Sequence, residues 1–156
     1  MLGIPRKLIV NPFDLTGLDK WTNFDTRKGF VAIQVFKAWK RVDTLIRAIP
    51  HMQTKEPKFV GGEGIEYRYM TSQDKCKPKY FDEAGDRIWD KALRFGMTHM
   101  GTVPGDVTFQ TLREAKLQID PSYSKKYSSF GAHFNRTTVE AMICGAVPLA
   151  TDWGMA

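Results

Sequence analysis

Apolar runs alternate along this chain of 156 residues with segments whose apolar side chains recur at helical spacing. Residues 29–36 form a nearly continuous apolar run that is partly β-branched, and shorter runs lie at 58–62, 97–100, 117–121 and 147–151. Runs of this kind predict strands that are covered on both faces, as in a parallel sheet.

Helical patterns lie between these runs. Between residues 42 and 49 the apolar side chains follow the i, i+3, i+4, i+7 spacing of one helix face. Residues 81–95 predict a longer helix, with Asp82 as its N-cap and Gly96 as its end. Residues 65–70 alternate between large apolar or aromatic side chains and charged ones, which predicts an additional strand.

The alternation of strands and helices predicts the fold class α/β. We expect a Rossmann-like, doubly wound parallel sheet of five to six strands, with helices on both faces in three layers. Residues 1–28 are irregular and rich in polar side chains, so we expect an entry segment or interdomain linker there. Residues 29–156 are then one domain, because a chain of this length does not hold two typical ones.

Composition narrows the class of partner. The formal charge is +6, from 23 Lys and Arg against 17 Asp and Glu. A basic surplus favours an anionic partner such as a nucleotide, a nucleic acid or a phospholipid, although a solvated basic surface gives the same charge. The two cysteines match no metal-ligand spacing, and no apolar run reaches the length of a membrane span or a signal peptide. We therefore expect a cytoplasmic protein without a membrane span.

Candidate chemistry gathers after the predicted strands. In open α/β sheets, ligands bind beyond the carboxyl ends of the strands. One such loop carries Lys37 and Lys40, a second carries Thr102 and Val103, and a third is the polar segment 128–138. Cations from two of these loops would suit a diphosphate at this edge of the sheet.

The start of the predicted helix 136–145 is a candidate anion site. Its free N–H groups and the positive end of its dipole favour negative charge, and Arg136 and Thr137 add a cation and a hydroxyl group. Glu140 lies one turn further, among apolar neighbours. A carboxylate there can accept two hydrogen bonds from the vicinal hydroxyls of a ribose. The alternative is an ordinary helix acid on a water-facing side.

The last predicted helix and strand carry the most specific pattern in the chain. Residues 138–152 run Thr-Val-Glu-Ala-Met-Ile-Cys-Gly-Ala-Val-Pro-Leu-Ala-Thr-Asp. This segment resembles the donor-site signature of retaining glycosyltransferases that have two Rossmann-like domains, the GT-B type. In that family an acid-bearing helix ends in Ala-Met-Ala-Cys-Gly, and a strand similar to Pro-Val-Val-Ala-Thr-Asp follows.

Weaker matches occur in the order that the family has. Residues 10–14 resemble its interdomain junction, and Lys40 resembles its phosphate-binding lysine. Residues 101–104 resemble its base-binding turn, and residues 120–122 resemble its Pro-Ser pair after the fourth strand. More loosely, residues 64–69 resemble phage DNA α-glucosyltransferases.

The resemblance implies the C-terminal, donor-binding half of a GT-B hexosyltransferase. Such an enzyme moves a sugar, for example glucose, from a UDP-sugar with retention of anomeric configuration, and it needs no metal or other cofactor. The acceptor, DNA or a glycan, would be bound by an N-terminal domain. Because the chain is too short for both domains, we expect a fragment that also lacks the last elements of its own domain, binds a nucleotide weakly and does not turn over alone.

The resemblance also implies roles for individual positions. Glu140 would bind the ribose hydroxyls, and Lys40 would bind the diphosphate. Backbone groups around Thr102 and Val103 would hold a uracil-type base, and backbone N–H groups of residues 135–137 would face the phosphates. We assign no catalytic residue. The candidate nucleotide-sugar site comprises Glu140, Lys40, Lys37, Arg136, Thr137, Asn135, Thr102, Val103 and His133.

Two positions depart from the family pattern. The family carries a second acid eight residues before the ribose-binding one, and Ala132 stands there. The family's Gly-Arg pair falls on Gln34 and Val35, so Lys37 or Arg136 would have to supply the missing cation. Because the missing acid normally touches the sugar, these departures leave the identity of the sugar open.

Two other functions fit the sequence. The positive charge fits a nucleic-acid-binding α/β module, and so do aromatic side chains near cations, such as Trp39, Tyr67, Tyr69 and Tyr80. Aromatic side chains in a small domain are also common core residues. The absence of the second acid at Ala132 fits a degenerate, non-catalytic Rossmann-like domain.

Overall fold

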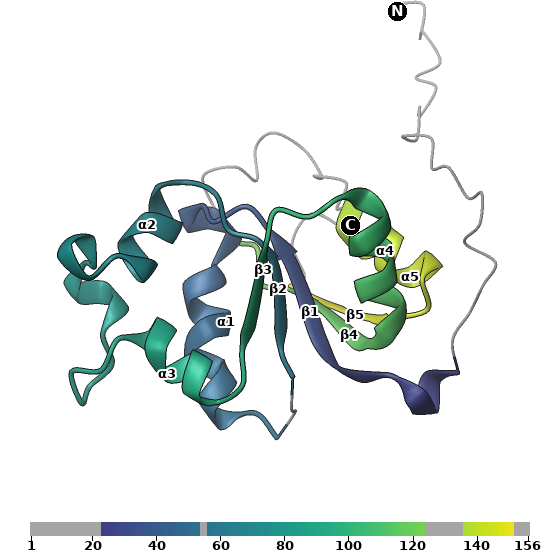
Figure 1. Cartoon of the computed structure of the whole chain (residues 1–156), viewed down its shortest axis with the longest axis horizontal. Coiled ribbons are helices and arrows are strands. Elements are labelled where there is room, and N and C mark those ends of the chain that lie inside the picture. The colour runs from purple at the N-terminus through teal and green to yellow at the C-terminus, as the bar shows by residue number, and fades with distance from the viewer. Residues whose placement is uncertain (1–22, 54–55, 124–135, 152–156) are drawn as a thin grey trace, which may run out of the picture.

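A computed structural model describes residues 23–53, 56–123 and 136–151 of the chain. They form a three-layer α/β/α sandwich around one five-stranded sheet (Figure 1). All neighbouring strands are parallel, in the order β3-β2-β1-β4-β5. The predicted Rossmann-like, doubly wound α/β fold is therefore confirmed. The strands are β1 (Lys28–Gln34), β2 (Lys58–Gly61), β3 (Thr98–Gly101), β4 (Ala115–Asp120) and β5 (Val147–Ala150).

Helices cover both faces of the sheet (Figure 1). One face carries α1 (Val42–Ala48), α2 (Ile65–Thr71) and α3 (Ile88–Arg94), and the other carries α4 (Gly105–Glu114) and α5 (Arg136–Ile143). None of the helices in the described part of the chain has the length and apolar character needed to cross a membrane. Short 3-10 turns occupy Phe24–Thr26, Ala38–Lys40, Ile49–His51, Gln73–Lys75 and Pro78–Tyr80.

The order of the strands determines where a ligand can bind. The chain moves outward from β1 to β2 and β3, and then returns to pair β4 with the other edge of β1. Helix α1, which follows β1, and helix α5, which follows β4 in the chain, consequently lie on opposite faces of the sheet. In doubly wound sheets this reversal opens a crevice at the carboxyl ends of the two strands.

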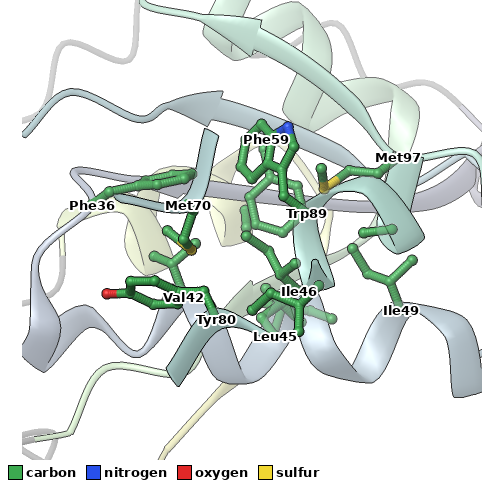
Figure 2. Packing of buried hydrophobic residues seen from close by; sticks show 14 of the residues in the cluster. Phe36, Val42, Leu45, Ile46, Ile49, Phe59, Met70, Tyr80, Trp89 and Met97 are labelled. Atoms are coloured by element: carbon green, nitrogen blue, oxygen red, sulfur yellow. The ribbon is translucent and has the colours of Figure 1, made fainter. Parts of the chain in front are cut away.

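The larger core lies between the sheet and helices α1 to α3. Figure 2 shows Phe36 and Phe59 beside Trp89 of α3, with Ile46 of α1 below them. The rings of Phe36 and Trp89 meet edge to face, with centroids 6.1 Å apart. Each such buried side chain contributes about 1.5–3 kcal/mol of hydrophobic stabilisation, so this packing holds β1 and β2 against α1 and α3.

The smaller core lies between the sheet and helices α4 and α5. Leu112 of α4 and Val31 of β1 are fully buried there. The buried apolar residues of and just after α5 are small, namely Ala141, Cys144 and Ala146. Small side chains let a helix approach a sheet closely, so α5 is held with its first residues at the carboxyl edge of the strands.

The prediction of a strand over 65–70 is wrong, because these residues form helix α2. Gly64, with φ 116°, lies directly before the helix. Tyr67 and Met70 both pack in the larger core. The two residues are three apart and therefore share a face in a helix, whereas in a strand they would point in opposite directions. The alternation of apolar and charged side chains over these six residues fits a strand and a helix equally well.

The helix predicted over 81–95 is shorter than expected and begins at Ile88. Asp82 does not cap it. Its carboxylate accepts hydrogen bonds from the backbone N–H groups of Ala84 and Asp86 at 3.0 and 2.9 Å, which stabilises a turn instead. Aspartate side chains compete with helix formation in this way. Gly96, with φ 88°, follows the helix end as predicted.

Gly61→Ala is expected to lower the free energy of unfolding by about 3 kcal/mol or more. Gly61 has φ 100°, and an added Cβ would lie 2.3 Å from the backbone oxygen of Gln34 on β1. Urea denaturation of the two proteins measures the loss. Gly105→Ala is the matched control, because no atom lies within 4 Å of its Cβ position. Equal stabilities of the two variants would contradict this account of the β1–β2 junction.

Candidate functional site

A cavity of about 590 Å³ opens at the carboxyl edge of the sheet. Residues at or just after the ends of all five strands line it, together with the first residues of α5. This is the position at which open α/β sheets bind ligands. Its lining includes Val35 after β1, Gly62 after β2, Thr102 after β3, Ser122 after β4 and Thr151 after β5.

Glycine keeps the loop after β2 close to the sheet. The N–H group of Gly62 donates to the backbone oxygen of Gln34 at 3.1 Å. A Cβ at Gly62 would lie 2.6 Å from Nε2 of His99, a nitrogen that is 2.7 Å from the backbone oxygen of Gly61. Because these positions carry no side chains, the floor of the cavity near β2 is formed by backbone.

Lys40 is a half-buried cation on the wall of the cavity. It ends the short turn Ala38–Lys40, and its Nζ lies 4.5 Å from the centroid of the Trp39 ring. Burial lowers the pKa of the Lys40 ammonium group below its usual value. The carboxylate of Asp120 opposes that shift, and the charge of Lys37 adds to it. An anion in the cavity would compensate the desolvated charge of Lys40.

Asp120 is a buried acid at the end of β4 that lines the same cavity. Its Oδ1 accepts hydrogen bonds from the N–H group of Ser122, at 2.9 Å, and from the Ser122 hydroxyl group. The N–H group of Thr151 donates to the backbone oxygen of Asp120 at 3.2 Å, and that of Tyr123 donates to Trp39 at 2.8 Å. These bonds tie the ends of β4 and β5 to the turn that carries Lys40.

Arg136 and Glu140 form an ion pair along α5. Nε of Arg136 lies 2.7 Å from Oε1 of Glu140. The Arg136 side chain is 70% exposed and lines the cavity, whereas the Glu140 side chain is only 11% exposed. Among the described residues, those that line the cavity do not include Glu140. Glu140 therefore orients Arg136 from behind, one helical turn away.

The structure brings most of the predicted site residues together. Lys40, Thr102, Val103, Arg136 and Thr137 all line the cavity. Glu140 lies behind Arg136. Lys37 lines a separate cavity of about 90 Å³ next to Arg41 and Lys79. Asn135 and His133 lie outside the described residues, as does Ala132.

Several cavity residues were not predicted as site residues, among them Gln34, Glu63, Asp120 and Thr151. Each lies within two residues of the end of a strand, which is a signal that sequence reasoning can use. Glu63 was missed because residues 65–70 were predicted to form a strand. Residues 62–64 then had the position of a turn between two strands, whereas they connect a strand to a helix. The buried side-chain amide of Gln34 has no hydrogen-bond partner among the described residues, which costs about 1–3 kcal/mol unless a ligand or water supplies one.

The cavity is equipped to bind a polar, anionic ligand. Lys40 and Arg136 supply positive charge from two separate segments, and Thr102 and Thr137 supply hydroxyl groups. Asp120 and Glu63 supply carboxylates. No group of three or more His, Cys, Asp or Glu side chains in residues 23–53, 56–123 and 136–151 is arranged to hold a metal ion.

No known protein-family profile matches this chain, and no curated protein sequence matches it. The geometry of the cavity and the chemistry of its residues therefore indicate what kind of ligand it can bind.

Asp120→Asn is expected to lower the pKa of Lys40 further, because the variant removes the negative charge that opposes the effect of burial. Lys37→Ala is expected to raise that pKa, because it removes a repelling cation. Since only the neutral amine reacts, labelling of lysine amines at increasing pH, read by mass spectrometry, reports the pKa of Lys40.

Asp74→Asn is the matched control for this measurement, because Asp74 is exposed on the turn Gln73–Lys75 and does not line the cavity. The Lys40 labelling midpoint should stay at the wild-type pH in that variant. Shifts of the same sign in the Asp120 and Lys37 variants would contradict the electrostatic account of the cavity.

Proposed function

We propose that this chain is the donor-binding half of a retaining glycosyltransferase and that its cavity takes a nucleotide-diphosphate sugar. The observation that carries the proposal is the convergence of Lys40 and Arg136, from two separate segments, on one cavity at the carboxyl edge of a doubly wound sheet. The resemblance of residues 138–152 supplies the class of reaction, and it indicates a UDP-sugar as the donor substrate.

Lys40, Arg136 and Thr137 bind the diphosphate in this proposal. The Lys40 ammonium group is half-buried, so a bound phosphate replaces part of the water that it has lost. Arg136 lies at the first position of α5, where backbone N–H groups and the helix dipole also favour an anion. Its guanidinium group offers paired N–H donors that match phosphate oxygens.

The nucleoside extends from the diphosphate toward Thr102 and Val103. The resemblance gives this turn to the base and gives Glu140 to the ribose hydroxyls. Glu140 already accepts a hydrogen bond from Arg136, so it binds a ribose only if it shares its carboxylate between Arg136 and the sugar. Glu140→Gln therefore tests two roles, the orientation of Arg136 and the direct binding of ribose.

The proposed chemistry follows from the charges. Cleavage of the bond between the sugar and the diphosphate leaves negative charge on the diphosphate. Lys40, Arg136 and the start of α5 stabilise that charge electrostatically. Because the acceptor and its base come from another domain in this class of enzyme, we expect the chain alone to bind a nucleotide and to transfer no sugar.

A nucleic-acid-binding module is the second candidate function. Nζ of Lys77 lies 3.8 Å from the ring centroid of Tyr69, and Nζ of Lys79 lies 4.6 Å from that of Tyr80. Such pairs can stack bases when the rings are exposed. Tyr80 is 1% exposed, however, and Tyr67 packs against Trp89 in the larger core. Because these rings are packed in the core, they are poor sites for stacking bases. The cavity therefore supports nucleotide binding more strongly than the aromatic rings support binding of nucleic acid.

Saturating UDP or UDP-glucose is expected to raise the melting temperature of the chain by several degrees, because a ligand at 100 times its Kd stabilises the folded state by about 2.7 kcal/mol. Lys40→Ala should weaken UDP binding about tenfold or more, because it removes a charge-assisted contact. Calorimetric titration measures the affinities.

Lys75→Ala is the matched control, because Lys75 is exposed and does not line the cavity. It should bind UDP as the wild type does. Absence of stabilisation by any nucleoside diphosphate would refute the proposal. DNA binding that weakens steeply with salt and ignores UDP would support the nucleic-acid module instead.

A further inference from the structure

The cavity contains an acid for which the proposed donor site has no role. Glu63 follows β2, is exposed and lines the cavity. Glu63 and Asp120 lie on opposite sides of β1, because β2 pairs with one edge of β1 and β4 pairs with the other. A carboxylate at this position must either repel the ligand or hydrogen-bond with it.

The backbone of Glu63 is fixed to the end of β1. Its backbone oxygen accepts a hydrogen bond from the N–H group of Phe36 at 3.2 Å. Glycines flank it on both sides, and Gly64 has φ 116°. A Cβ at Gly64 would lie 3.0 Å from the backbone oxygen of Phe36. The close approach of these two backbone segments, at Phe36 and at Gly64, determines where the Glu63 side chain leaves the backbone.

The carboxylate of Glu63 is oriented by a neutral group. The hydroxyl group of Thr102, after β3, donates to Oε1 of Glu63 at 3.0 Å. Glu63 takes part in none of the ion pairs found between described residues. In this it differs from Glu140, whose carboxylate is neutralised by Arg136 at 2.7 Å. Glu63 is thus a cavity acid that a hydroxyl group holds in place.

The charges of the cavity are therefore distributed unequally along the sheet. Glu63 and Thr102 lie over β2 and β3, and no cation pairs with Glu63 among the described residues. Lys40 follows β1 and Arg136 belongs to the helix that precedes β5, and the acid on that side, Asp120, is buried and bonded to Ser122. Neighbouring strands are about 4.8 Å apart, so the five strand ends span about 19 Å. A phosphate is attracted to the cationic part and repelled by Glu63. The uncharged part of the ligand then lies at Glu63.

We propose that Glu63 binds the nucleoside by accepting hydrogen bonds from a pair of adjacent donor groups. This inference rests on the proposed nucleotide function. It gives Glu63 a contact with the nucleoside that the resemblance gives to Glu140, because Glu140 is paired with Arg136 and does not line the cavity. A carboxylate has two acceptor oxygens and so matches two neighbouring donors. A nucleoside presents such a pair in two places, the 2′- and 3′-hydroxyls of ribose and the N1–H and 2-amino groups of guanine.

General features of nucleotide-binding folds support the ribose hydroxyls as one source of the pair. In dinucleotide-binding α/β domains, an acid downstream of the phosphate-binding turn hydrogen-bonds the ribose. Glu63 occupies a comparable place, after the first helix and at the end of the second strand. The guanine edge is the other source, because Thr102 belongs to the turn that the proposed function gives to the base.

Calorimetric titration of the whole chain with four nucleotides separates these sources. The four are UDP, 2′-deoxy-UDP, GDP and inosine diphosphate, which lacks the 2-amino group of guanine. If Glu63 binds the ribose, the wild type prefers UDP to 2′-deoxy-UDP about tenfold or more, and Glu63→Gln binds both equally. If Glu63 binds guanine, the preference of GDP over inosine diphosphate is lost instead.

Two further variants make the test specific. Thr102→Val removes only the hydroxyl group that orients the carboxylate, so it should reduce the same preference by a smaller factor. Glu83→Gln makes the same chemical change at an exposed acid that does not line the cavity, and it should leave every affinity unchanged. Melting temperatures of the variants without nucleotide show that each one folds.

The outcomes separate this inference from the proposed function. If the wild type binds nucleotides through Lys40 and Glu63→Gln shows the wild-type preferences, the role of Glu63 is overturned and the proposed function stands. If Glu63→Gln loses the same affinity for all four nucleotides, the role of Glu63 is also overturned. Recognition of a donor pair would lower the affinity only for the nucleotides that carry that pair. If the wild type binds no nucleotide, both proposals fail.

Discussion

The burial of β1 on both faces and both edges is the constraint on which the rest of the structure depends. β1 pairs with β2 on one edge and with β4 on the other. Phe30 faces the larger core, and Val31 faces the smaller one. A strand in this position is apolar over most of its length, here Phe30 to Ile33, and it needs a helix layer on each side. The reversal of strand order at β1 then opens the crevice in which the cavity lies.

The cavity combines desolvated charge with a backbone that is held from several strands. A hydrogen bond from the N–H group of Tyr123 to the backbone oxygen of Trp39 links the turn that carries Lys40 to the chain after β4, and Asp120 opposes the effect of burial on the pKa of Lys40. Glu140 orients Arg136 from behind. These groups belong to different strands and helices, so no single segment contains the site. Folding of the sheet is what brings these charged groups together in one cavity.

The site residues divide into those that a local pattern predicts and those that it does not. Lys40, Thr102 and Arg136 were predicted because each follows a strand or begins a helix, where ligands of α/β folds bind. Glu63 was missed because the pattern of residues 65–70 fits a strand as well as a helix. Glu140 was predicted to face the ligand, but its ion pair with Arg136 depends on which side of α5 packs against the sheet.

By itself, the sequence determined the fold class and the approximate places of the five strands, because continuous apolar runs and helical spacing are local properties. It also determined that cations and hydroxyl groups follow several strands. Only the tertiary structure decided that 65–71 is a helix, since the core contacts of Tyr67 and Met70 select between two patterns that fit equally well. Only the tertiary structure decided which charges share a cavity, because strand order brings residues together that are far apart in the chain.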